Sequence, residues 1–526
     1  MNKRYVLTID YGTQSVRAII YDQFGTECGK EQYKFEPYFS LQPGWAEQEV
    51  ETYWKNLTVA TKALRQQVGE EIWDKVEAMS ITTMRDSVIL MDKDRNVLRP
   101  CILWLDQREC KEAEFDIKPM AKAAFKMAKM YDTAVRQRTK SPCNWIKRNE
   151  PEIWNKMDKY ILFSCYMNYR LTGVLKDCVA NTIGHLPFDY KNKKWADDSL
   201  ITAGLYDVKK RHMPDLIEPG EVIGCITKEA SKDTGIKEGI PLISTGSDKG
   251  CETIGTGCVD SKGASISFGT TATIQMTLDK YVEPQKYVPS YPAIIKNKYN
   301  TEIQIYRGYW LLTWFKNEFA HKEVVEAKKL GCTPEYLLDK HLSEIHPGCD
   351  GLILQPYWSP GIALPNARGA IIGFSDYHTR AHLYRAIIEG INFGLYDGLK
   401  AIEKKANNRV EYLTVSGGGS HSDEICQITA DMFGLPVRKM QTYETGSLGA
   451  AMAVFTHLGV FKSFVEASKS MAHITKEYEP NAENTEIYKR LYNKVYKKIY
   501  PNNKHLYLNI KKIIGKNVQK IKYIKS

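Results

Sequence analysis

The sequence lacks long apolar runs and paired-cysteine motifs. No stretch approaches eighteen consecutive apolar residues, so we expect no membrane-spanning helix. The opening "MNKRYVLTIDYG" has neither the long apolar stretch nor the small-residue cleavage site of a secretory signal, so we expect a cytoplasmic protein. The twelve cysteines include no CxxC pair and no Cys/His cluster at zinc spacing, which argues against a disulfide scaffold or a structural zinc site.

Acidic residues are absent from the C-terminal end. From Lys489 to Ser526 the chain has twelve Lys or Arg and no Asp or Glu, and because its net charge is +11, residues 1–488 together carry −1. This distribution argues against a nucleic-acid partner for the body of the protein. We interpret residues 501–526 as a basic tail, either solvated and frayed or touching an anionic membrane or RNA.

The chain of 526 residues is too long for one core, and its patterns alternate between helix and strand. Apolar residues three or four apart predict a helix over 49–68, and "VEAMSITTM" predicts a strand over 76–84. A long helix is predicted over 379–405, and a strand, a glycine loop and a helix over 410–433. These alternations indicate an α/β architecture.

Two β-hairpins lie about half the chain length apart. The segments "IDYGTQSVRAIIY", from Ile9, and "ISFGTTATIQMTL", from Ile266, align an Ile, an aromatic residue, a Gly and a Thr, at an offset of 257 residues. Such an offset is typical of a duplicated fold. We therefore predict two similar α/β domains.

Three glycine-bearing loops could hold phosphates, although the sequence has no Walker motif and no Rossmann fingerprint. In "DYGTQS" and "FGTTAT" the glycine allows close approach and the hydroxyls can donate to phosphate oxygens, while "SGGGSHSDEI" precedes a helix N-terminus. Hairpin turns use Gly and Thr for their own geometry too, so each loop also has a purely structural explanation. The predicted nucleotide contacts are Gly12, Thr13, Gln14, Ser15, Arg17, Gly269, Thr270, Thr271, Gly417, Gly418, Gly419 and Ser422.

The two hairpins differ at one informative position. Asp10 opens the first, whereas Ser267 stands at the matching place in the second. One carboxylate beside a triphosphate suits Mg²⁺, which takes one or two carboxylates together with phosphate oxygens and waters. We predict Asp10 as the magnesium ligand, the alternative being that it caps its own turn.

The order of the motifs resembles the FGGY family of carbohydrate kinases from about residue 4 to about residue 500. The matching segments are "IDYGTQSVRAIIYD", "QPGWAEQEVETYW", "ITTMRDSVILMDKDRNVLRPCILWLDQR", "NYRLTG", "STGSDKG", "SFGTTA", "RGAIIGF" and "VSGGGS…ADMFGLPV…ETGSLGAA". The resemblance implies an actin/Hsp70-like ATPase fold of two duplicated, ribonuclease H-like domains with an interdomain cleft. It implies an N-terminal domain over 1–258 on the sugar side and a C-terminal domain over 259–500 on the nucleotide side. It also implies ATP and Mg²⁺ as cofactors.

The segment "STGSDKG" contains the candidate catalytic residue. From the residues alone, Asp248 at a strand-to-loop junction is either a helix cap or a carboxylate held as a general base. The resemblance points to the second role, because the catalytic aspartate of the family lies in a matching segment. Asp248 would then take a proton from the substrate hydroxyl during phosphoryl transfer.

Substrate contacts are suggested by "TMRDS" and "LWLDQR". Arg85 and Asp86 resemble the Arg-Glu pair that holds the polyol in glycerol kinases of the family, while Trp104 and Asp106 match its Trp-x-Asp. Their alternative is a surface salt bridge and a core tryptophan. Lys249 departs from the family pattern and either favours an acidic sugar or faces solvent.

A second departure lies at Tyr309 and Trp310, which are bulky where glycerol kinases are small beside the nucleotide, so that wall of the site is in question. We predict phosphorylation of a sugar, ketose or polyol, and a homodimer is possible. The alternatives are a catalytically silent sugar- or nucleotide-binding regulator on the same fold and an actin-like assembly protein. The second is disfavoured, because such a protein would not need the sugar-binding residues.

Overall fold

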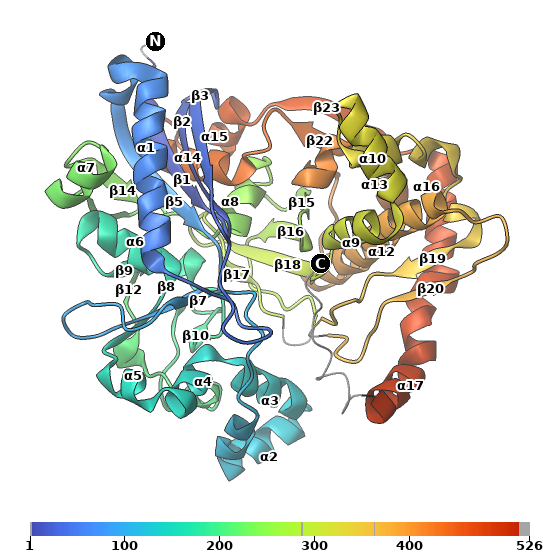
Figure 1. The fold of residues 1–526 in the computed structure, drawn as a ribbon, viewed down its shortest axis with the longest axis horizontal. Helices are drawn as coiled ribbons and strands as arrows, with labels where there is room; N and C mark the ends of the chain where they lie inside the picture. The colour runs from blue at the N-terminus through green and yellow to red at the C-terminus, as the bar shows by residue number, and fades with distance from the viewer. Residues whose placement is uncertain (1–2, 286–287, 362, 515–526) are drawn as a thin grey trace. The chain divides into compact units, whose positions relative to one another are not determined.

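The computed structural model describes residues 3–285, 288–361 and 363–514 (Figure 1). The chain forms two compact units, each assembled from separate stretches of sequence. The first unit contains residues 1–255, 291–299 and 444–472, and the second contains residues 256–290, 300–443 and 473–526. Within the described residues, no helix is both long enough and apolar enough to cross a membrane.

The first unit is built on a six-stranded sheet in the order β13-β14-β5-β1-β2-β3. The predicted hairpin is confirmed, because β1 and β2 pair antiparallel with Ile9 opposite Ala18. The predicted strand over 76–84 is β5, which pairs parallel with β1. The strands are β1 (Tyr5–Tyr11), β2 (Ser15–Asp22), β3 (Glu27–Lys34), β5 (Val76–Thr83), β13 (Val222–Cys225) and β14 (Pro241–Ile243).

The second unit repeats this plan with strands in the order β23-β22-β21-β15-β16-β18. Its hairpin β15–β16 is antiparallel, β15 pairs parallel with β21, and the outer pair β22–β23 is antiparallel, as β13–β14 is. The shared order confirms the duplicated α/β fold. The strands are β15 (Gly263–Phe268), β16 (Ala272–Leu278), β18 (Tyr299–Ile305), β21 (Tyr412–Ser416), β22 (Val437–Met440) and β23 (Ile474–Tyr478).

Helices bury the first sheet. The predicted helix over 49–68 is α1 (Val50–Trp73), which lies along β2 and β3 (Figure 1) and is interrupted at Gly69, where φ is +76°. Its apolar stripe joins one core with Leu7, Ile9 and Leu242 of the sheet. The other helices packed in this unit are α6 (Phe163–Thr172), α7 (Lys228–Thr234), α8 (Asp248–Gly255), α14 (Thr445–His457) and α15 (Phe464–Met471).

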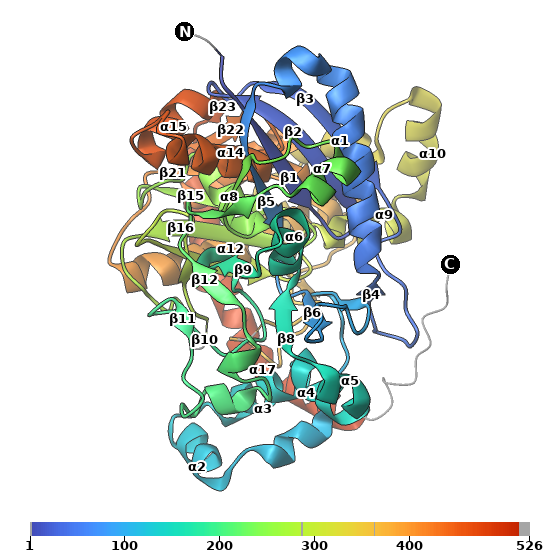
Figure 2. The ribbon, with the colours of Figure 1, turned by 90° about the vertical axis from the view of Figure 1, so that its left-hand side faces the viewer.

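A smaller lobe of the first unit extends beyond its main sheet. Figure 2 shows its short helices gathered beyond strand β8. A four-stranded sheet, β4-β7-β6-β8, carries this lobe and has its own apolar core. The elements are β4 (Glu47–Gln48), β6 (Val88–Met91), β7 (Cys101–Ile102), β8 (Lys159–Leu162), the 3₁₀ helix η1 (Lys111–Asp116), α2 (Pro119–Met127), α3 (Tyr131–Lys140), α4 (Pro142–Asn149) and α5 (Pro151–Lys156).

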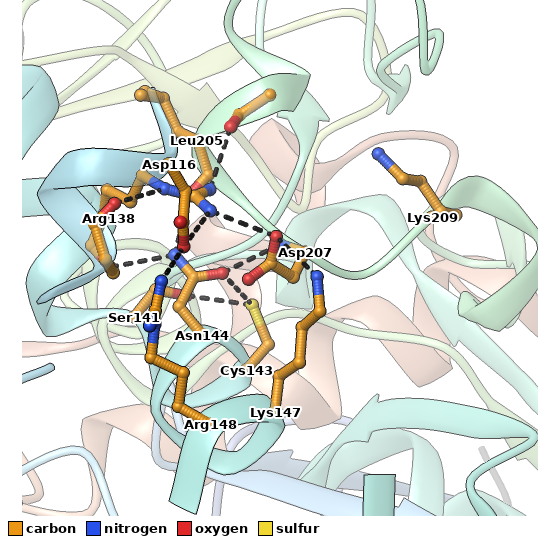
Figure 3. Close-up of polar contacts among 12 residues, drawn as sticks. Asp116, Arg138, Ser141, Cys143, Asn144, Lys147, Arg148, Leu205, Asp207 and Lys209 are labelled. Atoms are coloured by element: carbon orange, nitrogen blue, oxygen red, sulfur yellow. Dashed lines mark hydrogen bonds and ion pairs between the residues drawn. The ribbon is translucent and has the colours of Figure 1, made fainter. Parts of the chain in front are cut away.

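One buried guanidinium ties the smaller lobe together (Figure 3). Arg138, with 3% of its side chain exposed, donates from Nε to the Ala113 carbonyl at 2.7 Å and from Nη1 to the Gly204 carbonyl at 2.9 Å. Its Nη2 lies 3.1 Å from Oδ1 of Asp207. Asn144 adds amide hydrogen bonds to the carbonyls of Arg138 and Leu205, both at 2.8 Å. Segments far apart in the sequence are thus joined through satisfied polar groups.

In the second unit the predicted helix over 379–405 is α12 (Arg380–Ala406), whose apolar face enters the core with β15, β16 and β21. The predicted strand, glycine loop and helix over 410–433 are β21, residues 417–422 and α13 (Asp423–Phe433). Residues 501–514 of the predicted tail form most of α17 (Lys497–Ile514), and residues 515–526 lie outside the described residues. Further elements of this unit are α9 (Trp310–Phe319), α10 (His321–Leu330), α11 (Pro334–Asp339), β19 (Ile353–Gln355), β20 (Ala370–Ile372) and α16 (Ala482–Leu491).

Candidate active site

Asp248 is the first residue of α8, directly after β14 and a short turn. Its Oδ1 accepts the Lys249 backbone N–H at 2.7 Å and lies 3.8 Å from Nε of Arg85, while 40% of the side chain is exposed. Desolvation by the surrounding protein raises the pKa of Asp248, and the charges of Arg85 and Lys249 oppose this shift. The carboxylate is therefore accessible and a stronger base than an ordinary aspartate.

Helix α14 fixes the position of α8 through two glycines. A Cβ atom on Gly255 would lie 1.8 Å from the Thr445 carbonyl oxygen, and one on Gly449 would lie 2.0 Å from that of Cys251. Only glycine permits helices to approach this closely. The segment "ETGSLGAA", more than 180 residues later in the chain, thus supports the helix that begins at Asp248.

Asp86 is held by a residue that sequence reasoning missed. His185 donates its backbone N–H to Oδ1 of Asp86 at 2.8 Å, and its Nδ1 lies 2.7 Å from Oδ2. Burial lowers the pKa of His185, but the charge and hydrogen bond of Asp86 outweigh it, so this pKa is raised. Asp86 has φ of +51°, a left-handed conformation that Asn and Asp tolerate better than most residues. The segment "GHLPF", which contains His185, carries no pattern that would predict a contact with Asp86, 99 residues earlier.

Trp104, a predicted sugar contact, lies next to Thr13 of the predicted phosphate loop in the first unit. Its indole N–H donates to Oγ1 of Thr13 at 2.9 Å, and the residue is 43% exposed. The exposed ring face can contact the C–H groups of a sugar.

Asp106, in contrast, has both carboxylate oxygens engaged by the protein. Oδ2 accepts the Ala46 N–H at 2.6 Å and an Arg108 N–H at 2.8 Å, while Oδ1 accepts from Nε of Arg108 at 2.8 Å. Only 4% of its side chain is exposed. The Arg108 guanidinium lies over the rings of Trp45 and Trp145, at 4.1 and 4.6 Å from their centroids. Asp106 therefore anchors the loop that carries Trp104.

Lys249 forms an ion pair inside its own helix. Its Nζ lies 2.6 Å from Oε2 of Glu252, one turn later, and the two side chains are 19% and 13% exposed. The lysine charge beside Asp248 is thus balanced by a neighbouring carboxylate.

Asp10 stands near the end of β1 in a half-buried charge cluster. Its Oδ2 lies 2.6 Å from Nη1 of Arg17, whose Nε lies 3.5 Å from Oε2 of Glu444. Burial raises the pKa of Asp10 to about 6, and the charge of Arg17 opposes this. Among the described residues none donates to Oδ1, so one oxygen is available to a cation, which fits Mg²⁺ bound mainly by phosphates and water. Glu444 was not predicted from the sequence.

The two hairpin loops use some of their polar groups to hold their own turns and leave other residues exposed. In the first, the Gly12 N–H donates to the Ser15 carbonyl at 2.9 Å, Gln14 is exposed, and the Ser15 hydroxyl lies 3.2 Å from the side-chain amide of Gln32, whose oxygen is placed to accept from it and from Arg17. In the second, which belongs to the other unit, Thr270 is exposed and the Thr271 hydroxyl donates to the Tyr306 carbonyl at 3.2 Å.

The glycine loop after β21 is shaped for close approach by a ligand. Gly417 has φ of +76°, and a Cβ on Gly418 would meet nothing within 4 Å, so this backbone borders open space. A Cβ on Gly419 would lie 2.2 Å from the Tyr309 ring. Ser422 caps α13 by accepting the Ile425 N–H. Tyr309 thus packs beneath the loop, against Phe268 at a ring-centroid distance of 4.9 Å.

Comparison with known proteins places these residues in a family. The model of the N-terminal domain of the FGGY family of carbohydrate kinases matches residues 5–255, and that of the C-terminal domain matches residues 264–457. The chain belongs to the FGGY family. This FGGY chain is accordingly a carbohydrate kinase, an enzyme that phosphorylates sugars, and nothing in the comparisons supports the alternative of a silent regulator.

Relatives of this FGGY kinase match along nearly their whole length. It is 29% identical over 510 residues to a xylulose kinase of Staphylococcus epidermidis, covering 94% of this chain and 96% of that one. It is 26% identical over 506 residues to a gluconokinase of Bacillus licheniformis, covering 93% and 94%. The solved xylulose kinase of Rhodospirillum rubrum shares the fold with a TM-score of 0.82 at 21% identity, covering 96% of this chain and all of that one.

Proposed function

We propose that this FGGY kinase transfers the γ-phosphoryl group of ATP to a hydroxyl of a neutral sugar, ketose or polyol, with Asp248 as the general base. The observation that carries the proposal is the environment of Asp248. Its carboxylate is exposed at a helix start and its pKa is raised, so it can accept the hydroxyl proton as the new P–O bond forms. Phosphoryl transfer otherwise needs positioning and charge neutralisation.

Arg85, Asp86 and Trp104 would hold the sugar. A guanidinium next to a carboxylate offers a donor and an acceptor to adjacent hydroxyls, and the exposed indole offers a flat apolar face. His185 already uses part of the hydrogen-bonding capacity of the Asp86 carboxylate and fixes the orientation of that group. Asp106 would act as a positioning residue, because its oxygens are engaged by Arg108 and Ala46.

The charges near Asp248 favour a neutral substrate. Arg85 and Lys249 are positive, whereas Asp86, Asp248 and Glu252 are negative. The group therefore carries one net negative charge with His185 neutral and no net charge with His185 protonated, the form that Asp86 favours. A sugar acid would add a further negative charge with no surplus cation to receive it. The competing candidate is an acidic sugar, for which Lys249 would have to leave Glu252.

The proposed nucleotide contacts lie on loops that each unit carries. Gly12, Thr13, Gln14, Ser15 and Arg17 would serve from the first unit, and Gly269, Thr270, Thr271, Gly417, Gly418, Gly419 and Ser422 from the second. Asp10 would hold Mg²⁺, which when bound neutralises charge on the phosphates. The cytoplasmic location and the homodimer stay predictions.

A substrate panel tests the proposal. ADP release by the purified full chain would be measured with ketoses, polyols and sugar acids, each with the Asp248→Asn variant as control. We expect the highest kcat/KM with a neutral member and little release from the variant. A sugar acid turned over tenfold better than every neutral compound would contradict the neutral substrate. Equal release by both proteins would contradict the role of Asp248.

A further inference from the structure

A cavity in the second unit lies apart from the proposed sugar, nucleotide and magnesium contacts. It has a volume of about 650 Å³ and is lined by the loop before β20 and by α17. We call it the α17 cavity. Its lining shares no residue with the proposed sugar and nucleotide contacts, and its volume is in the range of small-molecule sites.

The rim of the α17 cavity is positively charged. Arg368 comes from the loop and Lys511 from the helix, and both are exposed. Within residues 3–285, 288–361 and 363–514, neither cation has a carboxylate or hydrogen-bond partner, and none of the described residues that line the cavity is acidic. Two unpaired cations on facing segments suit an anion that both can contact.

The inner wall is aromatic and preorganised. Trp358 packs against Gly369, where a Cβ would lie 2.3 Å from its ring, and against Trp314 at a ring-centroid distance of 5.4 Å. Gly369 directly follows Arg368, so the loop turns its charged residue to the rim while the tryptophan stays fixed behind it. Such a ring offers a rigid surface for stacking.

A buried hydroxyl in the same wall has no partner. Tyr507 lies one helical turn before Lys511, so both residues point to the same side of α17. The residue is 7% exposed, and its Oη finds no hydrogen-bond partner in the described part of the chain. Buried hydroxyls are normally paired, so this donor indicates that a ligand or water completes the site.

We propose that the α17 cavity binds a phosphate monoester carried on a ring. Arg368 and Lys511 contact the phosphate, Tyr507 donates to it or to a ring oxygen, and Trp358 stacks on the ring. Two sources share this chemistry, a sugar phosphate and a nucleotide. Tyr357 and two prolines complete the wall and suit either ring.

Calorimetric binding to the full chain tests the proposal with D-ribose 5-phosphate, AMP and inorganic phosphate as probes. The Arg368→Gln/Lys511→Gln variant should bind the better ester at least tenfold more weakly than wild type. The Arg409→Gln/Lys512→Gln variant removes two exposed cations outside the cavity and should bind like wild type. Tyr507→Phe should weaken binding about three- to tenfold, in line with one lost hydrogen bond. The ester whose binding the Arg368→Gln/Lys511→Gln variant loses identifies the source.

Other outcomes would overturn the proposal. Absence of binding by both esters would do so, as would equal affinities of the cavity variant and its control, because the ligand would then sit elsewhere. Equal affinity for inorganic phosphate and both esters would overturn the role of the ring. Matching melting temperatures of all variants would show that lost binding does not reflect lost folding. Because the readout is binding, the result is independent of turnover by Asp248.

Discussion

Nδ1 of His185 lies 2.7 Å from Oδ2 of Asp86, while the backbone N–H of the same histidine reaches Oδ1. His185 therefore contacts both oxygens of the Asp86 carboxylate, which is the group proposed to accept hydrogen bonds from the sugar. Only 22% of the Asp86 side chain is exposed, which limits the directions from which a sugar hydroxyl can approach it. Sugar recognition should thus depend on a residue absent from every motif in the sequence.

Asp86→Asn should raise the KM for the sugar about 10- to 100-fold, because a hydrogen bond to a charged group contributes about 1.5 to 3 kcal/mol. Asparagine tolerates the positive φ, whereas alanine would add backbone strain. The KM for ATP should stay within threefold. Asp189→Asn, which alters a carboxylate four residues after His185 that is bonded to Asn192, is the control and should change neither value. Equal increases for sugar and ATP would mean that Asp86 supports the fold.

Asp248→Asn should lower kcat about 10²- to 10⁴-fold, the usual contribution of a general base. The amide keeps the size of the side chain, so ATP affinity measured by titration should persist. In wild type, the raised pKa has a further consequence: because the base must be deprotonated, kcat should fall as the pH drops through that pKa. A kcat of the variant within threefold of wild type would contradict the assignment.

The ion pair between Lys249 and Glu252 can be tested by a double-mutant cycle. Lys249→Gln and Glu252→Gln should each destabilise the protein, and the double variant should recover part of the loss. A coupling free energy of about 1 kcal/mol or more from urea unfolding would show that the residues act as a pair. Kinetics give the decisive contrast: selective loss of turnover on sugar acids in Lys249→Gln would show that the lysine reads the substrate instead.

Asp10→Asn should stabilise the enzyme above about pH 6 when Mg²⁺ is removed by a chelator. The folded pKa of Asp10 is about 6 and its ordinary value is 3.8, so the folded state binds this proton more tightly than the unfolded state does. The ionised carboxylate therefore costs up to about 3 kcal/mol above pH 6 and nothing below about pH 4. In melting curves from pH 4 to pH 8, the two proteins should have similar melting temperatures at pH 4, and Asp10→Asn should melt at the higher temperature above pH 6. A less stable variant at pH 8 would show that pairing with Arg17 outweighs burial.

Arg138→Ala should lower the free energy of unfolding by about 3 to 5 kcal/mol, because it leaves buried carbonyls and carboxylates without their donor. Arg148→Ala is the control: Arg138 lies 3.4 Å from Oδ2 of Asp116 and Arg148 pairs with the same carboxylate, but 39% of the Arg148 side chain is exposed. Its loss should be within about 1 kcal/mol. Urea unfolding followed by tryptophan fluorescence measures both. Similar losses would contradict a central role for Arg138.

Local patterns predicted the elements better than their assembly. The helix periodicity of α1 and α12 and the Gly-Thr turns of both hairpins depend on neighbours in sequence, so they could be read directly. The strand-to-helix junction at Asp248 was visible for the same reason. His185 and Glu444, in contrast, contact partners that lie 99 and 427 residues away in the sequence. A local periodicity carries no information about contacts over such separations. Likewise, nothing in "LWLDQR" indicates that the Arg108 guanidinium donates hydrogen bonds to both carboxylate oxygens of Asp106.

The return of residues 444–472 to the first unit has a consequence for synthesis. Until α14 (Thr445–His457) has left the ribosome, α8 lacks the glycine-bearing partner helix against which it packs, and β1 and β5 lack the same cover. A nascent chain ending near residue 255 would leave the Gly255 face of α8 open to water and to other chains. The first unit therefore completes its folding only after residue 472 has emerged, and until then chaperones can bind the incomplete unit.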